Sequence, residues 1–177
     1  IAAGNESTRT VTSHGWRLLM EHPDQLQYLV DNPDKIPGAC EEMLRYNTAF
    51  IMMRRTVMED IEVGGKQMHK GDKLIMHYHA MNHDESVFGE DSMKFDVTRA
   101  ERMPNLYKEH RSFGIGQHFC LGTHLARLEL RIMMEEMIPR LRNPKLAGEI
   151  KYTRSNLVNG IREMHITFDP AAKSEAA

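Results

Sequence analysis

The chain has few cysteines, almost no net charge and no long apolar segment. Its two cysteines, Cys40 and Cys120, do not make a disulfide framework, so a reducing, cytoplasmic setting is expected. The 23 basic and 25 acidic residues leave a net charge of -2, which gives no reason to expect nucleic acid or a charged membrane as a partner. No apolar segment approaches the roughly 20 residues that a membrane span requires. A chain of 177 residues, 41% of them hydrophobic, is long enough for one globular domain with a substantial core.

Apolar periodicity and the positions of proline predict a mainly helical chain with small β-sheets. Helices are expected at residues 1–21, 23–30, 37–46 and 121–141. Strands are expected at residues 54–63, 67–69, 73–78, 150–152 and 164–168, the last two around a turn at Asn159-Gly160. Residues 82–109 are rich in turn formers, which predicts a meandering loop with a short helix at most.

The longest predicted helix carries an apolar stripe that is expected to be its buried face. The residues of the stripe are Leu121, Leu125, Leu128 and Ile132. The methionines of the same helix, Met133, Met134 and Met137, are expected to lie in the core.

Cys120 follows a glycine-rich loop and directly precedes this helix. A helix N-terminus carries partial positive charge and free N–H donors, which lower the pKa of a thiol and hydrogen-bond its sulfur. The glycines let the backbone approach a flat, bulky ligand closely. A thiolate held in this way is the ligand expected for a haem iron that cleaves O–O bonds. The alternative is a buried structural cysteine after a turn, which is the usual fate of a cysteine and is the expectation for Cys40.

The segment around Cys120 resembles the cysteine-ligand loop of the cytochrome P-450 family, F-G-x-G-x-H-x-C-x-G. Every fixed position is filled, by Phe113, Gly114, Gly116, His118, Cys120 and Gly122. The resemblance implies that these residues bind haem b and that Cys120 is the axial ligand of its iron. It also implies the mainly helical P-450 architecture, of which residues 1–177 would be a C-terminal part, because family members are much longer and this chain does not begin with Met.

The stretch Ala3-Gly4-Asn5-Glu6-Ser7-Thr8 places a glycine within a predicted helix, at a cost of about 1 kcal/mol relative to alanine. It resembles the oxygen-activation motif of the family, which implies catalytic roles for Glu6, Ser7 and Thr8 in delivering protons to bound dioxygen. Ser7 stands where the family usually has threonine, and its hydroxyl can bond the carbonyl four residues back. The alternative is a capping-type cluster in an N-terminal tail.

Glu42 and Arg45 lie three residues apart, a spacing that by itself is typical of a solvated surface pair. Their place ahead of Cys120 resembles the E-x-x-R of the family, which implies a buried structural pair joined by Arg99. The resemblance also implies that Arg55 and His118 bind the haem propionates, since an anion favours a guanidinium or a ring N–H. Arg54 should face the other side of the strand from Arg55. The alternative for Arg55 and His118 is an ordinary surface group.

The resemblance places Ala3, Ala49, Phe50, Ile51 and Val158 around a pocket for an apolar substrate. His77 and His79 are expected to share a strand face, a spacing that can bind metal. No cysteine or carboxylate at a matched spacing completes such a site, and ordinary strand and turn histidines, including His83, are the better interpretation.

Together the motifs imply a haem-thiolate monooxygenase that inserts one atom of O2 into a C–H bond of an apolar small molecule. Its electrons would come from a separate ferredoxin and reductase, because the sequence contains no flavin or iron–sulfur motif. The chain is similar to bacterial enzymes that oxidise steroid side chains, branched lipids or terpenes. Two alternatives stay open: a haem-thiolate peroxygenase or isomerase, and an inactive truncated fragment.

Overall fold

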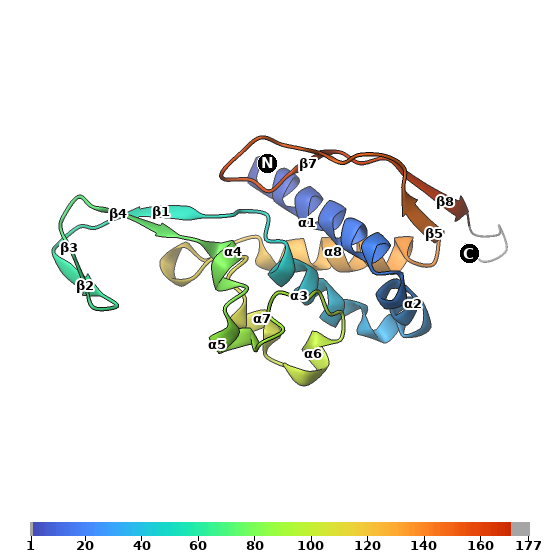
Figure 1. Cartoon of the computed structure of the whole chain (residues 1–177), viewed down its shortest axis with the longest axis horizontal. Coiled ribbons are helices and arrows are strands. Elements are labelled where there is room, and N and C mark those ends of the chain that lie inside the picture. The colour runs from blue at the N-terminus through green and yellow to red at the C-terminus, as the bar shows by residue number, and fades with distance from the viewer. Residues whose placement is uncertain (1, 171–177) are drawn as a thin grey trace.

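Three helices form the centre of the protein, for which a computed structural model describes residues 2–170. They are α1 (Ala2–Glu21), α3 (Ile36–Tyr46) and α8 (Thr123–Met137), and each packs against the other two (Figure 1). Gly15 marks the crossing point, because a Cβ atom at this position would lie 2.7 Å from Met43 Sδ and 2.9 Å from Met134 Cε. The absence of a side chain therefore lets α1 approach α3 and α8 closely.

Proline sets the start of the helices that follow α1. Pro23 opens α2 (Pro23–Asp31), and Pro33 opens a short 3-10 helix that leads into α3. Pro37 lies in the first turn of α3, where a missing N–H leaves no broken hydrogen bond. These observations confirm the helices predicted around residues 1–21, 23–30 and 37–46.

The strands pair as antiparallel two-stranded sheets. The pairs are β1 (Met53–Thr56) with β4 (Lys73–Met76), β2 (Ile61–Val63) with β3 (Lys66–Met68), β5 (Leu141–Leu146) with β8 (Ile166–Pro170), and β6 (Lys151–Tyr152) with β7 (Ile161–Glu163). The strands β1 to β4 extend from one end of the helical core, β5 and β8 lie at the other end, and β7 runs over α1 (Figure 1). Gly64 and Gly65 both have positive φ, 57° and 73°, which suits the tight turn between β2 and β3.

The predicted strand over residues 54–63 is wrong as a single strand. It divides into β1 and β2, because Asp60 turns its carboxylate onto the opposite segment and accepts the backbone N–H of Lys70 at 2.9 Å. The strand predicted at 73–78 also stops early, at Met76. His77 accepts the backbone N–H of Ala80 at 3.1 Å and so begins α4 (Tyr78–Met81), which means that His77 and His79 do not share a strand face.

The meander is more helical than predicted. It contains α5 (Glu85–Phe88), α6 (Arg99–Arg102) and α7 (Leu106–Glu109), each a single turn. Asp84 begins α5 by accepting the backbone N–H of Ser86 at 2.9 Å, a local side-chain cap rather than a periodic signal. Such short turns carry too few residues for apolar periodicity to reveal them.

The C-terminal part contains more strands than predicted. The predicted strands near 150–152 and 164–168 exist, as β6 and β8, but they do not pair with each other. Each pairs instead with an unpredicted strand, β7 or β5. The helix predicted to reach residue 141 ends at Met137, and β5 holds Pro144 at a register shift, where a missing N–H is tolerated.

The buried face predicted for the longest helix is wrong. Its residues are largely exposed, with exposed fractions of 100% for Leu121, 60% for Leu125, 47% for Leu128 and 45% for Ile132. The helix instead turns Leu130 and Met134 into the core, and Met137 packs against it, whereas Met133 is exposed. Apolar spacing identifies a stripe on a helix, but the neighbouring elements decide which stripe they cover.

Candidate ligand site at the cysteine loop

Two glycines shape the loop that leads to Cys120. Gly114 and Gly116 have φ values of 75° and 72°, a conformation that side-chain-bearing residues rarely adopt. At Gly114 there is a second constraint, since a Cβ atom would lie 3.3 Å from the hydroxyl oxygen of Tyr78. The loop is closed by the N–H of Cys120, which donates to the carbonyl of Phe113 at 2.9 Å.

The two cysteines differ in their exposure to solvent. Cys40 is buried within α3, and desolvation raises the pKa of its thiol far above the ordinary range, so it stays protonated. Cys120 is exposed, just ahead of α8, whose first residue is Thr123. Cys40 is therefore the buried thiol that was expected, and Cys120 is not the buried structural cysteine of the alternative interpretation.

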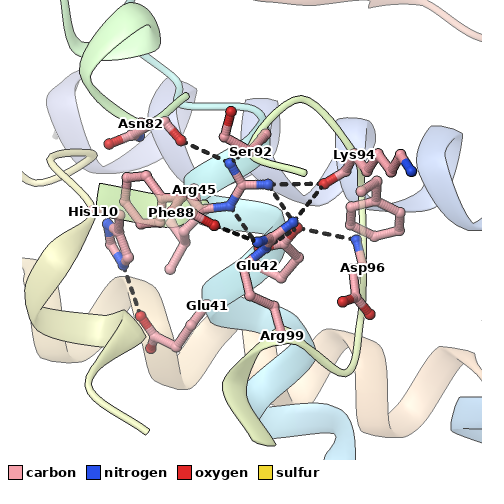
Figure 2. Close-up of polar contacts among 12 residues, drawn as sticks. Glu41, Glu42, Arg45, Asn82, Phe88, Ser92, Lys94, Asp96, Arg99 and His110 are labelled. Atoms are coloured by element: carbon pink, nitrogen blue, oxygen red, sulfur yellow. Dashed lines mark hydrogen bonds and ion pairs between the residues drawn. The ribbon is translucent and has the colours of Figure 1, made fainter. Parts of the chain in front are cut away.

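The structure brings Glu42, Arg45 and Arg99 together in a fully buried ion cluster (Figure 2). Arg45 Nε and Nη2 donate to the two carboxylate oxygens of Glu42 at 2.7 and 2.8 Å, a bidentate pair. Arg99 Nε lies 3.1 Å from the same carboxylate. All three side chains have an exposed fraction of 0%, so the pair is not the solvated surface pair that spacing alone suggests.

Backbone carbonyls of the meander, together with the carboxylate of Asp91, satisfy the remaining donors of the cluster. Arg45 Nη1 donates to the carbonyls of Asn82 and Ser92, both at 2.7 Å. Arg99 Nη2 donates to the carbonyls of Asp91 and Lys94 at 2.9 and 3.0 Å. Charges this deeply buried persist only when their hydrogen bonds are satisfied, so the cluster fixes the meander onto α3.

Asn82 connects this cluster to the cysteine loop, although no motif in the sequence distinguishes it. Its backbone carbonyl binds Arg45, while its side-chain oxygen accepts the N–H of Arg111 at 2.6 Å. Its side-chain nitrogen donates to the hydroxyl of Ser112 at 2.9 Å, and that hydroxyl donates to the carbonyl of Leu44 at 2.6 Å. The stem of the loop is thereby tied to the helix that carries Glu42 and Arg45.

Glu6, Ser7 and Thr8 lie in the first turns of α1. The Ser7 hydroxyl donates to the carbonyl of Ala3 at 2.7 Å, the back-bond that its position in a helix allows. The carboxylate of Glu6 pairs with Arg9 at 2.8 Å. In Figure 1 the N-terminal end of α1 and the loop ahead of α8 lie toward the same end of the helical core.

The two predicted pocket segments meet each other. Phe50 and Val158 form an isolated antiparallel bridge, flanked by hydrogen bonds from Ile51 N–H to Leu157 O and from Asn159 N–H to Ala49 O, both 2.9 Å. The second segment also reaches α1, since a Cβ atom at Gly160 would lie 3.3 Å from Glu6 Oε1. Ala49 is buried, whereas Phe50, Ile51 and Val158 are half-buried and Ala3 is exposed.

His14 fixes the second pocket segment to α1. Its Nε2 lies 2.7 Å from the carbonyl oxygen of Asn159, and Arg17 Nε donates to its Nδ1 at 3.4 Å. Because Nδ1 accepts, the proton of the neutral ring is on Nε2 and points at the carbonyl. Burial lowers the pKa of His14 to about 4, although the carbonyl opposes this effect, so the ring is neutral near pH 7.

The two candidate propionate ligands have no anionic partner within the chain as described. Arg55 is half-buried in β1 and Arg54 is exposed, which confirms that the two side chains alternate. Arg55 Nη1 donates to the carbonyl of Arg54 at 3.1 Å, and His118 is exposed on the loop. Among residues 2–170 no carboxylate forms an ion pair with either of them, so both are available to an external anion.

The fold and the loop define a class of protein: a mainly helical chain that offers a single thiol from a glycine-rich loop, braced by a buried ion cluster. The profile of the cytochrome P-450 family matches residues 36–144, and the chain belongs to that family. The resemblance in the sequence and the predicted architecture are confirmed. The described part of the chain contains no helix long and apolar enough to cross a bilayer.

Relatives with curated names share this match over almost the whole chain. Linalool 8-monooxygenase of Pseudomonas putida is 38% identical over 170 residues, which cover 96% of this chain and 40% of that protein. Steroid C26-monooxygenase of Mycolicibacterium smegmatis is 40% identical over 174 residues, which cover 97% and 42%. The chain thus spans about two fifths of the length of the curated relatives it matches.

A solved structure shows the same fold. A cytochrome P-450 from Mycobacterium marinum, in the substrate-free form, superposes with a TM-score of 0.89 at 30% identity. The match covers 97% of this chain and 43% of that one.

Haem is the cofactor of this family, and the residues of the loop fit it. The thiol of Cys120 is exposed rather than bonded or buried. At Gly116 an added Cβ atom would meet nothing within 4 Å, so the loop leaves open space beside its backbone. Phe119 and Leu121, the neighbours of Cys120 in the chain, have exposed apolar side chains, which suit a porphyrin.

Proposed function

We propose that the protein is a haem-thiolate monooxygenase that inserts one oxygen atom of O2 into a C–H bond of an apolar small molecule. The observation that carries this proposal is the exposed Cys120, presented by a loop that the Glu42–Arg45–Arg99 cluster braces in a chain of this family. The monooxygenase names of the relatives from Pseudomonas putida and Mycolicibacterium smegmatis support it.

Cys120 would hold the iron of haem b through its thiolate, with Phe113, Gly114, Gly116 and Gly122 forming the surface against the porphyrin. When bound, haem supplies the iron chemistry that activates dioxygen, and a thiolate ligand favours O–O cleavage. Arg55 and His118 would neutralise the propionates, for which a guanidinium and a ring N–H are suitable donors.

Glu6, Ser7 and Thr8 would deliver protons to the reacting oxygen. The Ser7 hydroxyl now donates to Ala3 O, so it must give up this hydrogen bond, by rotation about χ1 or about the Cβ–Oγ bond, to present its proton elsewhere. Serine can do so readily, because it lacks the methyl group that restricts threonine. Glu6 Oε1 lies near Gly160 at the edge of the pocket segment, and its side chain is open to solvent, with which the carboxylate would exchange protons.

Ala3, Ala49, Phe50, Ile51 and Val158 would line the pocket, and their side chains favour an apolar substrate. Because the names of the relatives mention linalool and steroids, we place the substrate among terpenes, branched lipids and steroid side chains. We place the protein in the cytoplasm, with electrons supplied by a separate ferredoxin and its reductase.

The test is turnover with isotopically labelled O2 in the haem-loaded protein, expressed with whatever sequence flanks this chain in its gene. With NADH and a surrogate ferredoxin and reductase, one labelled oxygen atom should appear in the product of a linalool or steroid substrate. Ser7→Ala should release more peroxide per NADH consumed. If the NADH reaction gave no product labelled from O2, and product formed only when peroxide was supplied, the result would contradict the proposal and identify a peroxygenase.

A further inference from the structure

A second ion cluster lies on α3 beside the first one. Glu41 precedes Glu42 in the sequence, but its carboxylate faces α8 instead of the meander. Arg127 Nε donates to Glu41 Oε1 at 2.7 Å and Arg127 Nη2 donates to Oε2 at 3.0 Å, which makes a bidentate pair between α3 and α8. His110 Nε2 lies 2.9 Å from Glu41 Oε2, and the two side chains point toward each other in Figure 2.

The cluster is largely withdrawn from solvent. The exposed fraction of the side chain is 1% for His110, 16% for Glu41 and 22% for Arg127. Burial raises the pKa of Glu41, but the hydrogen bonds from His110 and Arg127 outweigh that effect and hold the pKa below its ordinary value. The carboxylate is therefore ionised near neutral pH.

The backbone N–H of Ser112 determines which ring nitrogen of His110 carries the proton. The backbone N–H of Ser112 points at His110 Nδ1 at 3.4 Å, so Nδ1 is an acceptor and Nε2 carries the proton. His110 thus donates to Glu41 through its Nε2–H. An amide nitrogen at the same place could make the same bond, whereas an aliphatic side chain could not.

Arg127 reaches the cysteine loop through an aromatic ring. Its guanidinium carbon lies 4.7 Å from the centroid of the Phe113 ring, within the range of a cation–π interaction. His110 contacts the same ring, with 5.9 Å between ring centroids. Two further donors of Arg127 bind Thr123 Oγ1 at 2.8 Å and the carbonyl of Tyr107 at 3.0 Å, and these four hydrogen bonds together hold the guanidinium in one orientation.

Phe113 in turn fixes the backbone of Cys120. Its carbonyl oxygen accepts the Cys120 N–H at 2.9 Å, the hydrogen bond that closes the loop. A continuous series of contacts therefore runs from Glu41 through Arg127 and His110 to Phe113, and from Phe113 to Cys120. Glu42 holds the meander, and its neighbour Glu41 holds the loop.

We propose that Glu41, Arg127 and His110 are positioning residues that orient the Cys120 thiolate through Phe113. This inference rests on the proposed function, since it concerns the ligand that Cys120 would offer to haem. Residues that orient a ligand from behind typically change metal affinity or activity by roughly 10- to 100-fold when they are replaced.

The experiment compares four variants of the haem-loaded protein. Arg127→Lys keeps the charge but loses the planar fork, and His110→Leu removes the donor to Glu41. His110→Gln restores a donor at the position of Nε2. Arg131→Lys is the control, because Arg131 lies on the same helix in an exposed pair with Glu135 at 3.2 Å.

The readout is the rate at which the reduced carbon monoxide complex loses the absorption signature of thiolate ligation. Arg127→Lys and His110→Leu should raise this rate roughly 10-fold, while Arg131→Lys and His110→Gln should stay near the wild-type rate. Wild-type rates in both Arg127→Lys and His110→Leu would overturn the inference, as would equal rates for His110→Leu and His110→Gln.

Two checks distinguish a loss of thiolate positioning from misfolding of a variant and from failure of the proposed function. Circular dichroism shows whether each variant keeps its helices, and if Arg127→Lys does not fold, the comparison of His110→Leu with His110→Gln decides the question. A wild-type protein that never shows the thiolate signature would contradict the proposed function itself, before any variant is compared.

Discussion

Replacing Glu42 with glutamine should destabilise the protein strongly, because it removes the carboxylate that Arg45 and Arg99 share. Glu42 accepts hydrogen bonds from Arg45, from Arg99 and from the backbone N–H of Asp96, the last at 3.0 Å. Glutamine has nearly the same shape but leaves two guanidinium groups buried without a counter-charge on α3.

The magnitude follows from burial. The side chains of Glu42, Arg45 and Arg99 are all fully inaccessible, so water cannot compensate for the lost charge. Breaking a buried ion pair by removing one partner costs about 3–5 kcal/mol. Asp91 pairs with Arg99 at 3.1 Å and reduces the penalty on that side, which places the expected loss near the lower end, about 3 kcal/mol.

The assay is urea unfolding of wild type and variant, followed by circular dichroism. The matched control is Glu135→Gln, which breaks an exposed pair with Arg131 and should cost at most about 0.5 kcal/mol. A Glu42→Gln loss no larger than that of the control would refute the reasoning, because it would mean that the buried cluster contributes no more than a surface pair.

Three further predictions concern helix packing, pH and the cysteine loop. Gly15→Val should lower the free energy of unfolding by about 1–3 kcal/mol, since it overpacks the contact of α1 with α3 and α8; an unchanged urea midpoint would contradict this. The pKa of His14 is lowered from 6.5 to about 4, so its contribution to stability is complete above pH 6.5 and is lost as the pH falls toward 4. His14→Gln should flatten that part of the stability curve, and an equal slope in both proteins would be the contrary result. Gly114→Ala should lower the melting temperature, because it strains a positive φ and meets the Tyr78 hydroxyl; equal melting temperatures would rule out both effects.

Local signals in the sequence predicted much of the helical core. Proline in a first turn locates the starts of α2 and α3 correctly, because the ring fixes φ whatever the tertiary context. The helix carrying Glu42 and Arg45 was predicted from the same features, but burial of the pair could be predicted only from the resemblance. Spacing alone favours a surface pair, and the meander that covers it lies 37 or more positions further along the chain.

The remaining differences between prediction and structure arise where tertiary contacts determine which residues are buried and where short helices begin. The apolar stripe of α8 has the correct period but faces outward, and its neighbour Leu130 is buried instead. The short turns of the meander depend on single side-chain caps such as Asp84. The role of Glu41 beside the cysteine loop could not be predicted from the sequence either. Its partners lie 69 and 86 positions away, and nothing in its local sequence distinguishes it from a surface acid.

Ligation of haem by the Cys120 thiolate is the central claim, and the reduced carbon monoxide spectrum of the haem-loaded protein tests it most directly. Cys120→Ser should abolish the thiolate signature, while Cys40→Ala, which removes the buried thiol, should retain it. A Cys120→Ser protein with the wild-type spectrum would contradict the account.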